Sequence, residues 1–100
     1  MFKSVYKRLA NDFAFLQDFG FQYSRDECHY VRPSVIFSNR ISEIQIGMHY
    51  EDKRMYVIYY KDKNPFSGIN ILENVQLQGD TYEKQLFQVI YIVGEYLSSL

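Results

Sequence analysis

Cysteine, tryptophan and long apolar runs are what this 100-residue chain has least of. Cys28 is the only cysteine and there is no tryptophan. The chain therefore cannot form an internal disulfide, and nothing in it indicates an oxidising compartment. Its longest apolar runs are too short to span a bilayer, and its basic first residues are not followed by the apolar run of a signal peptide. We therefore expect a soluble, cytoplasmic protein.

A dominant sign of charge is also missing, because 11 lysines and arginines stand against 12 aspartates and glutamates, for a net charge of −1. Nucleic acids and anionic membranes attract proteins that carry a concentrated positive field, so we expect neither as a partner. The charge is uneven along the chain, since residues 64–100 hold one lysine and four carboxylates. An acidic segment suits a basic partner, and it equally suits a solvated face that keeps the protein soluble.

Motifs for catalysis, phosphate binding and metal binding are absent from the sequence. The glycines are isolated, so they form neither a GxGxxG motif nor a P-loop. Cys28 and His29 adjoin, but neighbours on an extended chain point to opposite faces and cannot easily cooperate. His49, Glu51 and Asp52 offer metal ligands at one hairpin end without a second cluster to complete a site. We predict no catalytic residue, no metal site and no cofactor.

What the chain has in quantity is apolar and aromatic surface. Apolar residues make up 47% of it, and the aromatic 18% consists of ten tyrosines and eight phenylalanines. One hundred residues bury a single core and leave nothing for a second one. Residues 1–100 are therefore predicted to form one domain.

Two segments have the apolar spacing of amphipathic helices. From Phe2 to Leu16 apolar residues recur at steps of three and four, and Gly20 follows as a left-handed C-cap. Near the other end, Asp80-Thr-Tyr-Glu83 resembles a capping box that begins a second helix. The apolar stripe expected on this second helix consists of Tyr82, Leu86, Phe87, Val89, Ile90, Val93 and Leu97.

Short extended segments lie between these helices. Phe21–Tyr30 is interpreted as two short strands joined by a polar turn at Ser24–Glu27. Pro33 cannot donate to a β-ladder, so we expect the strand Tyr30–Phe37 to be an edge strand or to be bulged there. Ile41–Tyr50 alternates apolar and polar residues, which predicts one buried and one wet face.

The next segment, Arg54–Lys61, is apolar or amphipathic on both faces, which is typical of a central strand covered on both sides. Residues 62–79 are irregular, and the sequence leaves open whether they form a loop, a strand or a short helix. The predicted fold class is thus α+β: an N-terminal helix, a central antiparallel sheet of about four strands and a C-terminal helix.

Clustered tyrosines are the most unusual feature, with Tyr50, Tyr56, Tyr59 and Tyr60 on one predicted hairpin. Exposed tyrosine provides a large contact area at low entropic cost and is enriched at protein interfaces. Alternatively, these rings complete the core and place their hydroxyls at its rim.

The order of the elements resembles that of small bacterial immunity proteins. The resemblance lies in an N-terminal helix that ends Phe15-Leu-Gln-Asp-Phe-Gly-Phe21, then Val35-Ile-Phe-Ser-Asn39, the strands Ile44–Tyr50 and Met55–Tyr60, and a closing helix. Such proteins are encoded beside toxins of contact-dependent growth inhibition and other polymorphic toxin systems. The resemblance implies a protein that binds a toxin domain and blocks its activity.

We therefore predict a non-enzymatic immunity-type inhibitor of a cognate bacterial toxin, with a basic nuclease among the candidate targets. The residues predicted to contact the toxin are acidic or aromatic: Glu73, Asp80, Tyr82, Glu83, Tyr56 and Tyr60. One alternative is a small enzyme or small-molecule binder with a site between the sheet and residues 62–79, using His29 or His49. Another is a homodimeric accessory or regulatory domain.

Overall fold

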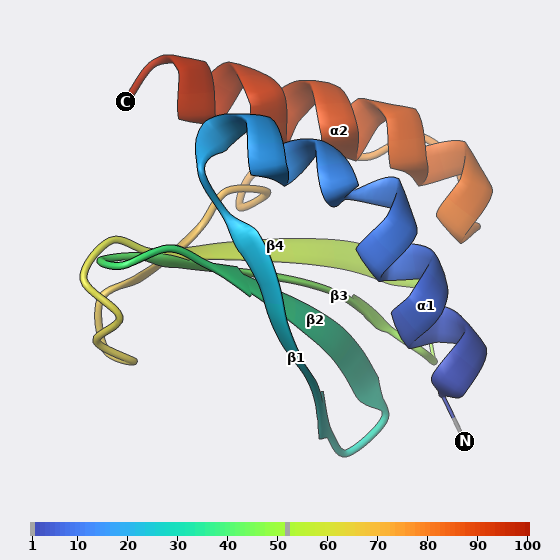
Figure 1. The fold of residues 1–100 in the computed structure, drawn as a ribbon. Coiled ribbons are helices and arrows are strands. Elements are labelled where there is room, and N and C mark those ends of the chain that lie inside the picture. Colours follow the sequence, from blue (N-terminus) through green and yellow to red (C-terminus); the bar gives the residue numbers. More distant parts are fainter. Residues whose placement is uncertain (1, 52) are drawn as a thin grey trace.

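The computed structural model describes residues 2–51 and 53–100 and has an α+β fold (Figure 1). The strands form one antiparallel sheet in the order β1-β2-β3-β4-β5. The predicted fold class is confirmed, with five strands rather than about four. In chain order the elements are α1 (Lys3–Asp12), a 3-10 helix η1 (Ala14–Phe19), β1 (Gln22–His29), β2 (Arg32–Ser38), β3 (Glu43–His49), β4 (Arg54–Tyr60), β5 (Gly68–Asn70) and α2 (Tyr82–Ser98).

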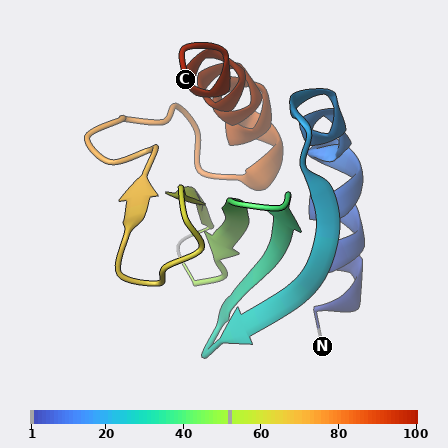
Figure 2. The same cartoon turned by 60° about the vertical axis from the view of Figure 1, so that its left-hand side comes forward.

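Both helices cover the same side of the sheet (Figures 1 and 2). Helix α1 packs against β2, and α2 packs against β4. The core lies between these layers, and its fully buried side chains are Leu9, Phe13, Leu16, Val35, Ile44, Ile46, Met55, Val57, Val89 and Val93. Within residues 2–51 and 53–100, no helix covers the opposite side of the sheet, which is called the open face below.

The N-terminal helical segment is divided into two parts. α1 ends at Asp12, and the 3-10 helix η1 continues to Phe19. Phe13 and Leu16 are both fully buried, and their spacing of three matches the repeat of a 3-10 helix. Gly20 has φ 88° and ends this second part, which confirms the predicted left-handed cap.

Strand β1 corrects the prediction of two short strands with a turn at Ser24–Glu27. It is one continuous edge strand with an irregularity at Ser24, because Tyr23 pairs with Phe37 and Arg25 with Ile36. A bulge absorbs the extra residue, and polar residues are tolerated because the strand is largely exposed. The prediction of an edge or bulged strand at Pro33 is wrong too. β2 lies between β1 and β3, and Pro33 precedes the β3 pairing, which begins at Ser34.

The sequence pattern predicted the burial of β3 correctly and that of β4 incorrectly. Ile44, Ile46 and Met48 of β3 are buried, as the alternation predicted. β4 is covered on one side only, contrary to the expectation from its two-sided aromatic character. Its residues Met55, Val57 and Tyr59 face the helices, whereas the side chains between them are partly exposed on the open face.

Helix α2 begins one residue later than the predicted capping box. Its N-cap is Thr81, whose hydroxyl accepts a hydrogen bond from the Lys84 N–H at 3.3 Å. Phe87, placed in the buried stripe by the sequence pattern, is 79% exposed, and Gln85 is buried instead. The irregular 62–79 segment contains the short strand β5 followed by turns. Within the described residues, no helix combines the length and apolarity needed to cross a membrane.

Candidate functional site: the open face of the sheet

The open face consists of the side chains that alternate with the core residues along each strand. From β2 these are Ser34 and Ile36, and from β3 they are Gln45 and Gly47. β4 contributes Tyr56, Ile58 and Tyr60. The period of two along a strand places every second residue here. The open face therefore combines aromatic and polar residues with the isoleucines of β2 and β4.

Two tyrosine rings lie flat on this face, each over a glycine of a neighbouring strand. Tyr56 is opposite Gly47, and Tyr60 is opposite Gly68. A Cβ atom at Gly47 would lie 2.6 Å from Tyr56 Cζ, and one at Gly68 would lie 2.8 Å from Tyr60 Cε1. A strand glycine often marks such a close approach. Burial raises the pKa of both tyrosines above the ordinary value, so their hydroxyls stay protonated at neutral pH.

A hydrogen-bonded network fixes the polar groups between these rings. The Gln45 amide donates to Ser34 Oγ at 2.9 Å and accepts from the Tyr60 hydroxyl at 3.3 Å. Ser34 is 1% exposed, and its hydroxyl also donates to the Glu27 carbonyl oxygen at 3.4 Å. Side chains joined in this way hold their orientation before any partner arrives.

A hollow of about 450 Å³ occupies one half of the open face. Its β1 wall carries Arg25, whose guanidinium forms ion pairs with Glu27 at 3.0 Å and with Glu43 at 3.3 Å. The opposite wall includes Lys63 and Pro65 of the segment after β4. Because Arg25 sits between two carboxylates, this half of the face carries nearly balanced charge.

A second hollow of about 250 Å³ continues along the same face and shares His29 and Gln45 with the first. The ring of His49 meets the Tyr56 ring edge-on here, with centroids 5.2 Å apart. Its lining residues come from all five strands: His29, Arg32, Gln45, His49, Tyr56, Ile58 and Asn70.

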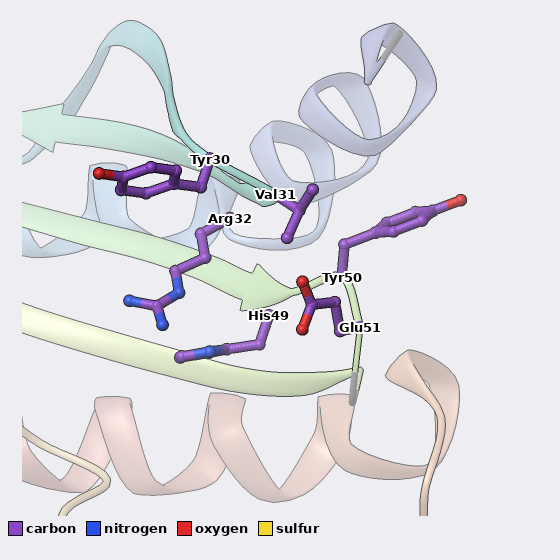
Figure 3. A pocket seen from close by; sticks show the side chains of 6 residues that line it. All are labelled: Tyr30, Val31, Arg32, His49, Tyr50 and Glu51. Atoms are coloured by element: carbon purple, nitrogen blue, oxygen red, sulfur yellow. The ribbon is translucent and has the colours of Figure 1, made fainter.

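The end of the sheet forms a third hollow of about 480 Å³ between the β1–β2 and β3–β4 turns. Figure 3 shows Arg32 and His49 extending to the same side of this hollow, whereas the Tyr50 ring points away from it. Tyr30 occupies the β1–β2 turn with φ 58° and is 93% exposed. Arg32 and His49 line this hollow and the 250 Å³ hollow alike, so they stand at the junction of the two.

The six residues predicted to contact a partner fall into separate places. Tyr56 and Tyr60 lie on the open face, as described above. Tyr82 is 7% exposed at the contact between the helices, where its hydroxyl donates to Asp12 at 2.7 Å and the Arg8 guanidinium covers its ring at 4.6 Å. Glu83 forms an ion pair with the same Arg8 at 2.6 Å.

The two remaining predicted residues belong to the connection between β5 and α2. Glu73 is exposed in the turn after β5. Asp80 is exposed and pairs with Lys84 at 3.4 Å. The structure therefore brings together Tyr56 and Tyr60 on one surface and places the acidic candidates elsewhere.

His29, Arg32 and His49 form a group that the sequence prediction missed. The sequence pattern predicts a turn at 24–27, whereas His29 ends the long strand β1. Cys28 and His29 lie on opposite sides of β1, as predicted, with the Cys28 thiol donating to the Tyr30 carbonyl at 3.1 Å. Alternation within β2 and β3 places each residue on one side of its own strand, and the register of the sheet brings Arg32 and His49 to the same face.

Metal binding finds no support in residues 2–51 and 53–100, because no three of their histidine, cysteine or carboxylate side chains converge. Asp52, one of the ligands considered from sequence, lies outside the described residues. Comparison with protein-family models, curated proteins and solved structures gives no match to this chain.

Proposed function

We propose that this protein is a cytoplasmic immunity-type inhibitor that binds a cognate bacterial toxin domain and neutralises it by contact. The observation that carries the proposal is the open face, where Tyr56 and Tyr60 lie over glycines and form a broad, partly exposed aromatic floor. Aromatic rings held in place by a polar network supply contact area at little entropic cost, as protein interfaces require. The inhibitor acts by covering the toxin and needs no catalytic group of its own.

The charge of the chain supports a basic toxin, such as a nuclease, as the target. Glu73 and Asp80 are exposed in the segment between β5 and α2, and Asp80 pairs with Lys84. Exposed carboxylates accelerate the approach of a basic partner over distances of about 8 Å at physiological salt. In this proposal the acidic residues steer the toxin, and the tyrosines of the open face hold it.

Co-expression with the toxin domain encoded by the neighbouring upstream reading frame tests this function. The wild-type protein should restore growth, and the double variant Tyr56→Ala/Tyr60→Ala should lose that protection while retaining a cooperative unfolding transition. Tyr91→Ala is the matched control, because Tyr91 is 68% exposed on α2, on the helical side. Growth restored equally by both variants would exclude the open face as the toxin-binding surface. A neighbouring frame without a toxin domain would argue against the proposal.

A small-molecule binder or enzyme is the second candidate, and the meeting of His29 and His49 in one hollow favours it. The double variant His29→Gln/His49→Gln distinguishes the two functions. An inhibitor should keep its affinity for the toxin in this variant, measured by calorimetry. A histidine-dependent enzyme should lose turnover of its substrate.

A further inference from the structure

Basic side chains form a row across one end of the open face. His29 of β1 pairs with Arg32 of β2, and His49 of β3 pairs with Arg54 of β4. Ser34 of β2 pairs with Gly47 of β3. Arg32 lies two residues before Ser34 and His49 two residues after Gly47, so these antiparallel strands place the two basic pairs side by side across the sheet. Each opposed pair joins one arginine and one histidine, so four basic side chains lie together on adjacent strands.

The row differs in its partners from the neighbouring arginine on the same face. Arg25 is neutralised by Glu27 and Glu43. Arg54 donates to the carbonyl oxygens of Leu72 and Val75 at 3.4 and 3.0 Å. The 250 Å³ hollow has Arg32 and both histidines in its wall, and none of its lining residues in the described part of the chain is a carboxylate.

Acidic side chains line the two adjoining hollows: Glu27, paired with Arg25, in the 450 Å³ hollow, and Glu51 in the hollow at the end of the sheet (Figure 3). Glu51 lies on the Tyr50 side of His49, whereas the guanidinium of Arg32 extends toward the other side. Arg32 and the two histidines therefore line the 250 Å³ hollow without a carboxylate of the described residues in the same wall. Tyr56 and Asn70 add a hydroxyl and an amide to the same wall.

We propose that this hollow is an oxyanion-binding site that takes a carboxylate or phosphate group between His29, Arg32 and His49. A guanidinium presents paired N–H donors that match both kinds of oxyanion. Whole ligands occupy cavities of about 300–1,000 Å³, so a hollow of 250 Å³ suits one charged group. The rest of the ligand continues into the 450 Å³ hollow, which shares His29 and Gln45.

The site requires only that the open face binds a ligand, and it does not depend on the identity of a toxin. The oxyanion in this proposal belongs to a small molecule. Small-anion probes test the shared chemistry directly. Their outcome is separate from that of the growth assay, so either proposal can fail alone.

Titration of the isotope-labelled full chain with sodium phosphate, and separately with sodium acetate, tests the site by NMR. The ionic strength is held constant with sodium chloride, at about pH 6, where histidine side chains are commonly part-protonated. Saturable shifts should appear at His29, Arg32 and His49. Response to phosphate alone identifies a phosphate site, response to acetate alone a carboxylate site, and response to both a general oxyanion site.

Arg32→Gln should weaken the binding at least about tenfold, a difference of about 1.4 kcal/mol. Arg40→Gln is the matched control, since it removes the same charge from an exposed position in the β2–β3 turn, at the other end of β2. His49→Gln gives a second test if Arg32→Gln unfolds. Shifts that do not saturate, or that weaken equally in Arg32→Gln and Arg40→Gln, would overturn the proposal.

Discussion

The two faces of the one sheet are built by the same strands and have opposite characters. On the helical side, Ile46 and Val57 are fully buried in a dry core. On the open side, Gln45, Tyr56 and Tyr60 join through hydrogen bonds or lie over glycines, and they remain partly exposed. The helical face obtains its stability from burial of apolar surface. The open face is ordered by local contacts between its own residues, so it stays available to a ligand.

A polar side chain therefore contributes differently to the stability of the protein on each face. On the helical side Gln85 is 3% exposed. Its oxygen accepts from the Met55 N–H at 2.9 Å, and its nitrogen donates to the carbonyls of Lys53 and Gly79 at 3.1 and 3.3 Å. One amide thereby joins the start of β4 to the segment before α2. Water cannot replace these bonds without opening the core.

The largest expected effect comes from Gln85→Leu on the helical side. The substitution removes three hydrogen bonds and leaves a buried N–H without its partner, so the free energy of unfolding should fall by about 3 kcal/mol. Urea unfolding measures the loss, and hydrogen exchange of the Met55 amide should accelerate in parallel.

Gln88→Leu is the control for this change, because Gln88 also makes three bonds, at 2.7 to 2.9 Å, to Gln78 and Lys84. Those groups are exposed and water replaces the lost bonds, so the cost should stay below about 1 kcal/mol. Equal losses in the two variants would contradict the distinction between buried and solvated amides.

A smaller effect, of about 2 kcal/mol, is expected from Gly47→Ala on the open face. The new methyl group would lie 2.6 Å from the Tyr56 ring and 2.7 Å from the Pro33 carbonyl oxygen, so both the ring and the backbone must move. Thermal unfolding measures the loss. Gly94→Ala should instead raise stability by about 0.5 kcal/mol, since it meets nothing within 4 Å and alanine favours a helix. A Gly47→Ala variant as stable as the wild type would argue against the flat placement of Tyr56.

The smallest effect, about 1 kcal/mol at neutral pH, is expected from Tyr82→Phe between the helices. Burial and the hydrogen bond to Asp12 raise the pKa of Tyr82 far above its ordinary value. Stability from this tyrosine is present below pH about 10 and declines as the pH rises above that value, because the unfolded chain then loses a proton that the folded protein retains.

Urea unfolding between neutral and alkaline pH follows this contribution, and Tyr82→Phe should flatten the decline. Tyr60→Phe on the open face is the control. Its hydroxyl donates to the neutral Gln45 amide at 3.3 Å and its ring is partly exposed. It should change the alkaline decline less than Tyr82→Phe does. A larger change in Tyr60→Phe would reverse the expected ranking of the two faces.

Local patterns predicted what depends on neighbours in the chain. The alternation of β3 identified its buried residues, and Gly20 was found because a left-handed cap needs little beyond its own backbone freedom. The turn at 24–27 and the covered β4 were wrong for one reason. Both predictions depend on what packs beside the strand. A polar run is tolerated in β1 because β1 is an edge strand, and β4 is covered on one face because both helices lie on one side of the sheet. No local pattern reveals either fact.

For the candidate site, the sequence supplied Tyr56 and Tyr60 but not the group around Arg32. The clustering of Tyr56 and Tyr60 on one strand is visible in the sequence. His29, Arg32 and His49 come from three strands, and only the register of the sheet aligns them. Tyr82 shows the opposite case, since its aromatic ring was predicted for a partner and is buried against Arg8 of the other helix.

The sequence by itself determined that this is an α+β chain with a helix near each end and tyrosine-rich strands between, because apolar periodicity fixes which segments can bury one side. Only the tertiary structure decided that both helices cover the same face and that four basic residues align across the other. Those outcomes depend on contacts between residues distant in the chain, and the hydrogen-bond register that creates them leaves no mark in any single segment.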